Sequence, residues 1–128
     1  MSAPRIEHVN VTVSDPDRVA ELLHALFGWR VRWQGAAMSG GRTIHVGDDD
    51  CYVALYAPPG GRSGPFDKGR PLNHIGVEVD DLDATEARVV SAGLTTFSHG
   101  DYHPGRRFYF MDPDGIEYEV VSYRSPTT

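Results

Sequence analysis

The sequence has 128 residues, of which 40% are hydrophobic and 23% are charged, and its formal net charge is −6 at pH 7. These values fit one ordinary domain with a real hydrophobic core and exclude a disordered chain. No stretch rich in lysine or arginine offsets the acidity, so nucleic acid and acidic membrane surfaces are poor partners. The one cysteine cannot form an internal disulfide, no signal-peptide pattern precedes the first strand, and no apolar run approaches the ~20 residues of a membrane span. We therefore expect a cytoplasmic protein.

The first half opens with "IEHVNVTVSD" (residues 6–15), whose alternation of apolar and polar residues predicts a strand. A helix is expected over 15–28, because apolar residues recur there at helical spacing, with Asp15 as the N-cap and Gly28 as the stop. Three short strands broken by turn residues follow: "WRVRWQ" (29–34), "TIHVG" (43–47) and "CYVALYA" (51–57).

A stretch rich in glycine and proline, residues 58–71, predicts an exposed linker. The second half then opens with "LNHIGVEVDD" (72–81), which predicts another strand, and a helix is expected over 81–93. Three further strands are predicted: "LTTFS" (94–98), "RRFYFMD" (106–112) and "IEYEVVSY" (116–123), the last two joined by the tight turn "DPDG" (112–115).

The two halves form an internal repeat. His8 and His74 each stand third in their opening segment, and an acid follows seven residues later in each copy, at Asp15 and Asp81. Each half reads strand, helix, strand, strand, strand, and such a half cannot bury its sheet alone. The sequence thus predicts a single α+β domain over 1–128, built from two paired βαβββ modules: 5–57 and 72–124.

Side chains alternate between the faces of a strand, so each opening strand has an apolar face and a polar face. The polar faces carry residues related by the repeat: His8, Asn10 and Thr12 in the first half, and His74, Gly76 and Glu78 in the second. The final strand places Glu117 and Glu119 on one face, and the repeat puts Ala54 at the position related to Glu119. We expect these polar faces to line a cavity on the side opposite the helices.

Two imidazoles and one carboxylate on one face of a metal are the ligand set of open-site Fe(II) enzymes. The pattern therefore favours a divalent-metal site formed by His8, His74 and Glu119, with Fe(II) preferred. The alternative interpretation is that both histidines are structural strand residues.

These segments resemble the vicinal oxygen chelate superfamily, also called the glyoxalase/bleomycin resistance/dioxygenase superfamily. The resemblance covers nearly the whole chain and rests on "EHVNVTVSD", "LFGW", "NHIGVEVDD", "AGL" and, most specifically, "FYFMDPDGIEYEV". It implies two paired βαβββ modules that form a curved mixed sheet around a central cavity, with the helices on the outer face. It also implies a divalent metal bound by His8, His74 and Glu119.

The chain is most similar to the extradiol dioxygenases among these relatives, through the three ligands and through Tyr109, ten residues before Glu119. Glyoxalase I and methylmalonyl-CoA epimerase carry a fourth ligand where this chain has Ala54, which disfavours their chemistry. The fosfomycin resistance thiol transferases share "FYFMDPDG", but their cationic pocket is expected to be absent here, because the only lysine, Lys68, falls in the linker. Extradiol enzymes carry a histidine upstream of the tyrosine, and His103 does not fall at that spacing.

The leading hypothesis is a metal-dependent enzyme of dioxygenase type that acts on an oxygen-rich small molecule. We expect Tyr109 to hydrogen-bond substrate or bound oxygen, and His103 or His99 to carry a proton, although a solvated loop pair is an equal alternative. Substrate contacts are expected from Asn10, Ala54 and Arg107, with Arg107 holding an anionic group or lying on the surface. Trp29 and Trp33 are interpreted as packing residues, with a cavity-lining indole as the alternative.

Two other functions stay open. An isomerase, epimerase or lyase on the same scaffold would use Ni(II), Zn(II), Mn(II) or Co(II), with Glu117 or Glu78 as general base. A metal-free protein that sequesters an antibiotic is the third hypothesis. The resemblance also implies a homodimer, in which one subunit supplies His8 and the other supplies His74 and Glu119; a monomer that closes both modules on itself is the alternative.

Overall fold

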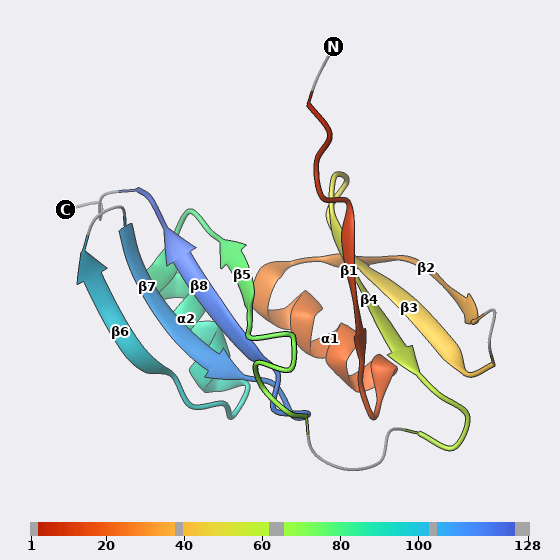
Figure 1. The fold of residues 1–128 in the computed structure, drawn as a ribbon. Coiled ribbons are helices and arrows are strands. Elements are labelled where there is room, and N and C mark those ends of the chain that lie inside the picture. The colour runs from red at the N-terminus through yellow and green to blue at the C-terminus, as the bar shows by residue number, and fades with distance from the viewer. Residues whose placement is uncertain (1–2, 38–39, 62–65, 103–104, 125–128) are drawn as a thin grey trace. The chain divides into compact units, whose positions relative to one another are not determined.

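The computed structural model describes residues 3–37, 40–61, 66–102 and 105–124 (Figure 1). Its contacts divide the chain into two compact units, residues 1–64 and 65–128, and each unit is described by itself. The division falls within the stretch predicted as a linker. Within the described residues, no helix is both long and apolar enough to cross a membrane.

The first unit is a four-stranded mixed sheet with one helix (Figure 1). Its sheet order is β1-β4-β3-β2, in which β1 and β4 are parallel and the other neighbours are antiparallel. The elements are β1 (His8–Thr12), α1 (Pro16–Phe27), β2 (Arg30–Ala36), β3 (Arg42–Gly47) and β4 (Tyr52–Ala57).

The second unit repeats this topology with the order β5-β8-β7-β6, and β5 and β8 are parallel. Its elements are β5 (Ile75–Glu78), α2 (Leu82–Ser91), β6 (Phe97–Tyr102), β7 (Gly105–Met111) and β8 (Glu117–Ser122). The predicted α+β class and its two βαβββ modules are therefore confirmed. A cavity enclosed by both modules stays a prediction.

Both helices begin and end where the sequence predicts, for local reasons. Asp15 and Asp81 are the N-caps, and their carboxylates accept the backbone N–H of Arg18 and Ala84, which would otherwise lack a partner. Helix α1 ends at Gly28, whose φ of +73° places it in the left-handed region that favours glycine.

Each helix packs on one face of its own sheet and leaves the other face open. In the first unit α1 contacts β2, β3 and β4, and in the second unit α2 contacts β7 and β8. The apolar core lies between helix and sheet; its fully buried members include Val13, Leu23, Ile44 and Leu55 in the first unit, and Val89, Phe108, Phe110 and Tyr118 in the second.

The turn "DPDG" forms as predicted and fixes the direction of β8. The carboxylate of Asp112 accepts the backbone N–H groups of Asp114 and Ile116, and Gly115 adopts a positive φ of 81°. Met111 pairs with Glu117 across the hairpin, and Tyr109 pairs with Glu119. The hairpin therefore sets Tyr109 and Glu119 side by side.

The strand predicted over 94–98 is wrong in its bounds, because β6 runs from Phe97 to Tyr102. A β-bulge lies between Phe97 and Gly100, and Ser98 within it has a φ of +52°. A bulge adds one residue to a strand and so reverses the alternation of faces beyond it. His99 consequently lies on the helix side of the sheet.

Candidate functional site

The open face of the second unit carries a cavity of about 410 Å³. Strands β6, β7 and β8 contribute to it, as does the chain segment that leads into β5. Its lining residues are Lys68, Asn73, His74, Phe97, Ser98, Tyr102, Tyr109 and Glu117. Predicted site residues His74 and Tyr109 therefore line one cavity.

Glu119 is the centre of the polar contacts at this cavity. Nε2 of His74 lies 3.1 Å from Oε1 of Glu119, and Nη1 of Arg107 donates to Oε2 at 2.8 Å. The side chain of Glu119 is only 14% exposed and that of Arg107 only 13%. One oxygen of this carboxylate is thus neutralised by arginine, while the other faces the imidazole.

Tyr109 completes the group of side chains around Glu119. Burial raises the pKa of the Tyr109 hydroxyl, and a hydrogen bond to the Glu119 carboxylate raises it further. The phenol is therefore protonated at neutral pH, and its proton is engaged with the Glu119 carboxylate. Its ring also meets the His74 ring edge-on, with centroids 5.9 Å apart.

The residue before each predicted metal-binding histidine contacts that histidine's Nδ1 atom. Asn73 Oδ1 lies 2.7 Å from Nδ1 of His74, and Glu7 Oε1 lies 3.0 Å from Nδ1 of His8. A side-chain oxygen on Nδ1 holds the proton there and leaves Nε2 with its lone pair, which is the arrangement of a metal-binding imidazole. Sequence analysis missed both residues, although "EH" and "NH" stand at equivalent points of the repeat.

The facing atoms of His74 and Glu119 suit a shared cation. If Nδ1 of His74 donates to Asn73, the lone pair of Nε2 faces a carboxylate oxygen, and a proton or a metal ion between them relieves the repulsion. Two ligands with bonds of about 2.1 Å at a right angle are about 3.0 Å apart. The observed 3.1 Å separation therefore fits two adjacent positions on one metal.

Lys68 also reaches this cavity, contrary to the expectation from its place in the linker. Its Nζ donates to Oε1 of Glu117 at 2.9 Å, and the side chain of Glu117 is only 7% exposed. Oε2 of Glu117 is 4.0 Å from Nδ1 of His74. A cationic group therefore lies at the cavity, and Glu117 is paired rather than free.

The first unit holds the remaining predicted residues on its own open face. Asn10 pairs with Ala54 in the register of β1 and β4, as Gly76 pairs with Glu119 in β5 and β8. Ala54 therefore occupies the repeat position of Glu119, as the sequence predicts, and it is buried. His8 begins β1, and its ring stacks on Tyr52 with centroids 4.8 Å apart.

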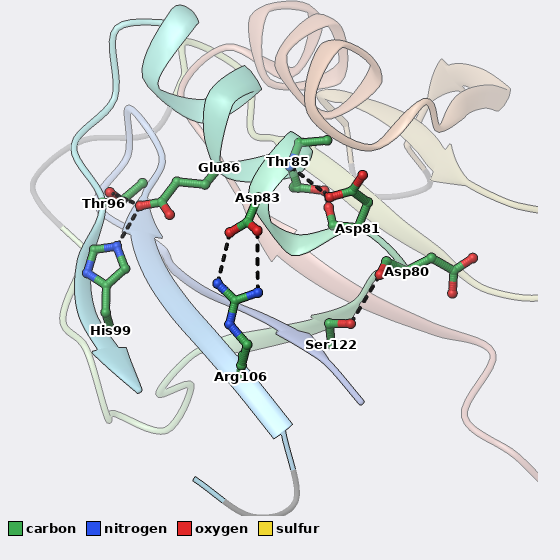
Figure 2. Close-up of polar contacts among 10 residues, drawn as sticks. Asp80, Asp81, Asp83, Thr85, Glu86, Thr96, His99, Arg106 and Ser122 are labelled. Atoms are coloured by element: carbon green, nitrogen blue, oxygen red, sulfur yellow. Dashed lines mark hydrogen bonds and ion pairs between the residues drawn. The ribbon is translucent and has the colours of Figure 1, made fainter. Parts of the chain in front are cut away.

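The two histidines considered as proton carriers are His99 and His103. His103 lies outside the described residues. His99 Nε2 lies 2.5 Å from Oε2 of Glu86 on α2, and Thr96 donates to the same oxygen, as Figure 2 shows. Arg106 pairs with Asp83 on the same helix side. The bulge in β6 thus places His99 on the helix side of the sheet, and this placement does not support a role for it at the cavity.

Among the residues that the structure describes, no three His, Cys, Asp or Glu side chains gather as a complete metal site. His74 and Glu119 belong to the second unit and His8 to the first. The second unit by itself brings together two of the three predicted ligands, His74 and Glu119.

A family model matches residues 5–120, which is most of the chain, and its description is Glyoxalase/Bleomycin resistance protein/Dioxygenase superfamily. The chain belongs to this superfamily. A search of curated protein sequences finds no significant match.

Solved structures with the same fold support this membership of the superfamily. A glyoxylase/bleomycin resistance protein/dioxygenase domain from Frankia sp. EAN1pec is 26% identical, with a TM-score of 0.83 over 96% of this chain and 100% of that one. The fosfomycin resistance protein FosX from Mesorhizobium loti is 26% identical, with a TM-score of 0.70 over 94% and 92%. TnmS3, an antibiotic binding protein from Streptomyces sp. CB03234, is 22% identical, with a TM-score of 0.69 over 95% and 98%.

Proposed function

We propose that this chain is a divalent-metal-dependent enzyme that acts on an oxygen-rich small molecule. The observation that carries the proposal is the approach of His74 Nε2 to Glu119 Oε1, at the 3.1 Å expected of two adjacent metal ligands. His8 is the proposed third ligand, since its Nδ1 is held by Glu7 as that of His74 is held by Asn73. Fe(II) is the preferred metal on the chemistry of a two-histidine, one-carboxylate set.

A divalent metal bound there would act as a Lewis acid on substrate oxygens, and iron would also support chemistry with dioxygen. The chain's own residues would orient the ligands. Arg107 holds one oxygen of Glu119, so the carboxylate can offer only the other oxygen to a metal. The Tyr109 hydroxyl would donate a hydrogen bond to substrate, and its raised pKa keeps the hydroxyl protonated.

Substrate contacts are proposed on the same faces. Asn10 lies on the open face of the first unit and pairs with Ala54 in the register of β1 and β4, and both are proposed to contact substrate. Arg107 is 2.8 Å from Glu119, so its charge is shared, and an anionic substrate group would have to compete for the guanidinium. The fosfomycin resistance neighbour makes a small, oxygen-rich anion a reasonable class of substrate to test.

The test is metal content by elemental analysis of protein purified without oxygen, with His74→Ala and His99→Ala as a matched pair. About one metal per chain in the parent and in His99→Ala, and none in His74→Ala, would support the proposal. Iron would direct assays to catechols and dioxygen. Nickel, zinc, manganese or cobalt would direct them to isomerase, lyase or transferase reactions. No metal in the parent after reconstitution would reject the enzyme proposal.

A specific contact bears on the isomerase alternative, which needs a carboxylate base. Glu117 is the better candidate of the two predicted, because it lines the cavity, but it is held by Lys68. An isomerase of this kind should lose activity in Glu117→Gln and keep its metal. Unchanged activity in that variant would remove Glu117 as the base.

The binding-protein alternative has its own support in the antibiotic-binding neighbour. It is favoured if the reconstituted protein holds no metal yet retains a small molecule through purification. We also propose that the protein is cytoplasmic and that it forms a homodimer. Light scattering on the purified chain would test the homodimer.

A further inference from the structure

Strand β6 sends the rings on either side of its bulge to opposite faces of the second sheet. Phe97 pairs with Tyr109 in the register, and their rings stack with centroids 6.1 Å apart. The ring of His99 stacks instead on Phe108, with centroids 6.2 Å apart. Phe108 is fully buried in the core, whereas Tyr109 lines the cavity. Residues 97 and 99 would share one face of a regular strand, so it is the bulge that separates them.

Ser98, within the bulge, has a backbone conformation that must be held in place. Its φ of +52° lies in the left-handed region, which residues other than glycine adopt at a cost in free energy. Such a residue keeps this conformation only where its surroundings fix it. Phe97 and Ser98 both line the cavity of the second unit. The shape of this part of the cavity wall therefore depends on the contacts that hold the bulge.

One carboxylate on helix α2 holds both flanks of the bulge, as Figure 2 shows. Oε2 of Glu86 accepts the hydroxyl of Thr96 at 2.6 Å and lies 2.5 Å from Nε2 of His99. Thr96 directly precedes Phe97 and His99 directly follows Ser98, so the two contacts enclose the residues that line the cavity. The Glu86 side chain is only 27% exposed, which partly shields both contacts from water. We call the side chains of Glu86, Thr96 and His99 the bulge anchor.

The groups around Glu86 keep its carboxylate ionised at neutral pH. Burial would raise the pKa of Glu86, and the charge of Asp83 would raise it too, but hydrogen bonds from His99 and Thr96 outweigh both and lower it. Asp83, one turn earlier on α2, is itself paired with Arg106 at 2.9 Å. An ionised carboxylate is purely an acceptor, so one oxygen of Glu86 can accept from both flanks of the bulge at once.

The bulge anchor reaches the candidate site through Phe97. The Tyr109 ring stacks on Phe97 and meets the His74 ring edge-on. The Tyr109 hydroxyl is hydrogen-bonded to the Glu119 carboxylate. Aromatic rings pack in preferred relative orientations, so a displacement of Phe97 changes the packing that orients the Tyr109 ring. Contacts on the helix side of the sheet are thereby linked to a side chain on the cavity side.

We propose that Glu86 is a positioning residue of the candidate site, which holds the bulge in β6 and so fixes Phe97 against Tyr109. Glu86 is not among the residues that line the cavity, and it acts through Thr96, His99 and the backbone of the bulge. The inference rests on the proposed function, because Tyr109 has its role toward substrate only there.

The experiment compares the aromatic ring signals of Tyr109 in NMR spectra of the parent and of variants, at pH 7 with EDTA present. Tyr109→Phe identifies these signals by their disappearance. Phe97→Leu removes the stacked ring and establishes the direction in which the Tyr109 signals shift when that ring is lost. Glu86→Ala should shift the Tyr109 signals in the same direction. Glu86→Gln keeps an acceptor oxygen and should cause a smaller shift.

Asp83→Ala is the matched control. It removes another acidic side chain from the same helix, along with the ion pair to Arg106, and leaves the bulge anchor intact. The Tyr109 signals should stay at their parent positions in this variant. Parent-like Tyr109 signals in Glu86→Ala, or equal shifts in Asp83→Ala and Glu86→Ala, would overturn the proposal.

Titration with Mn(II) separates this proposal from the proposed function. Glu86→Ala retains His8, His74 and Glu119, so it should bind Mn(II) as the parent does. Loss of Mn(II) binding in Glu86→Ala alone would show that Glu86 acts on the ligands instead of Tyr109, and would overturn the proposal. If the parent itself binds no Mn(II) or other divalent metal, the proposed function fails, while the Tyr109 shifts still decide whether Glu86 positions that ring.

Discussion

Nε2 of His74 lies 3.1 Å from Oε1 of Glu119, while Nδ1 of the same ring lies 2.7 Å from the side-chain oxygen of Asn73. Both nitrogens of the imidazole are therefore in contact with a side-chain oxygen, which fixes the orientation of the ring. This relationship brings together, within the second unit, the two side chains proposed as metal ligands. It also makes Asn73 a residue with a testable role.

Asn73→Ala should weaken metal binding while leaving both second-unit ligands in place. Loss of the side-chain oxygen that orients a metal-binding histidine typically reduces affinity by about 10- to 100-fold. Calorimetric titration of metal-free protein with Mn(II) measures this directly. Asn73→Asp is the matched control, since it restores an oxygen at the same place, as Glu7 provides for His8. Equal affinity of Asn73→Ala and parent would show that Asn73 does not orient the ring.

Arg107→Gln should strongly destabilise the metal-free protein. Arg107 and Glu119 are each close to nine-tenths buried, so removing the guanidinium leaves a nearly buried carboxylate with only His74 and Tyr109 beside it. Such a loss costs about 3 kcal/mol, measurable as a lower midpoint in urea denaturation. A divalent metal should recover part of the loss if it binds Glu119.

Arg106→Gln is the control for that measurement. The neighbouring Arg106 pairs with Asp83, whose side chain is 70% exposed, on the helix side of the same strand (Figure 2). Exposed pairs of this kind contribute about 0–1 kcal/mol. Similar losses in both variants would show that the Arg107–Glu119 pair has no special role in stability.

The stability of the second unit should depend on pH through Glu86. Burial alone would raise the pKa of Glu86, but hydrogen bonds from His99 and Thr96 outweigh it and lower the pKa below its ordinary value of 4.5. A carboxylate with a lowered pKa stabilises the folded state above its unfolded pKa, and the contribution is lost as the pH falls through the folded pKa. Glu86→Gln should therefore lower the midpoint of denaturation at pH 7, and the difference from the parent should shrink as the pH falls below 4.5 and through the folded pKa. A difference that stays constant from pH 7 to pH 3.5 would contradict this assignment.

The repeat explains why much of the fold could be predicted from sequence. Each module opens with an alternating strand that has a histidine third and is followed by a helix cap, Asp15 or Asp81. The hydrogen bond at each cap is local, so the start of each helix could be predicted. The "DPDG" turn could also be predicted, because its hydrogen bonds to Asp112 and the positive φ of Gly115 are local to the turn. The pairing of Tyr109 with Glu119 follows from that turn.

The two β-bulges explain what could not be predicted. Each adds a residue to the strand after its module's helix, at Arg32 in β2 and near Ser98 in β6, and each reverses the alternation that assigns side chains to faces. The sequence therefore left two roles open: packing or cavity lining for Trp33, and proton carrier or solvated loop residue for His99. Lys68 was misplaced for another reason: its contact with Glu117 joins positions 49 residues apart, and no local pattern encodes it.

Replacement of the two helix caps tests whether the modules unfold together. Asp15→Ala and Asp81→Ala each remove the side-chain acceptor for one helix, at a cost of about 1 kcal/mol. A βαβββ module cannot bury its sheet alone, so we expect a single cooperative transition in urea, whose midpoint falls in either variant. The two losses of unfolding free energy should add in the double variant, because the caps share no hydrogen-bond partner. If each module were stable alone, two transitions would be seen, and each replacement would move only the transition of its own module.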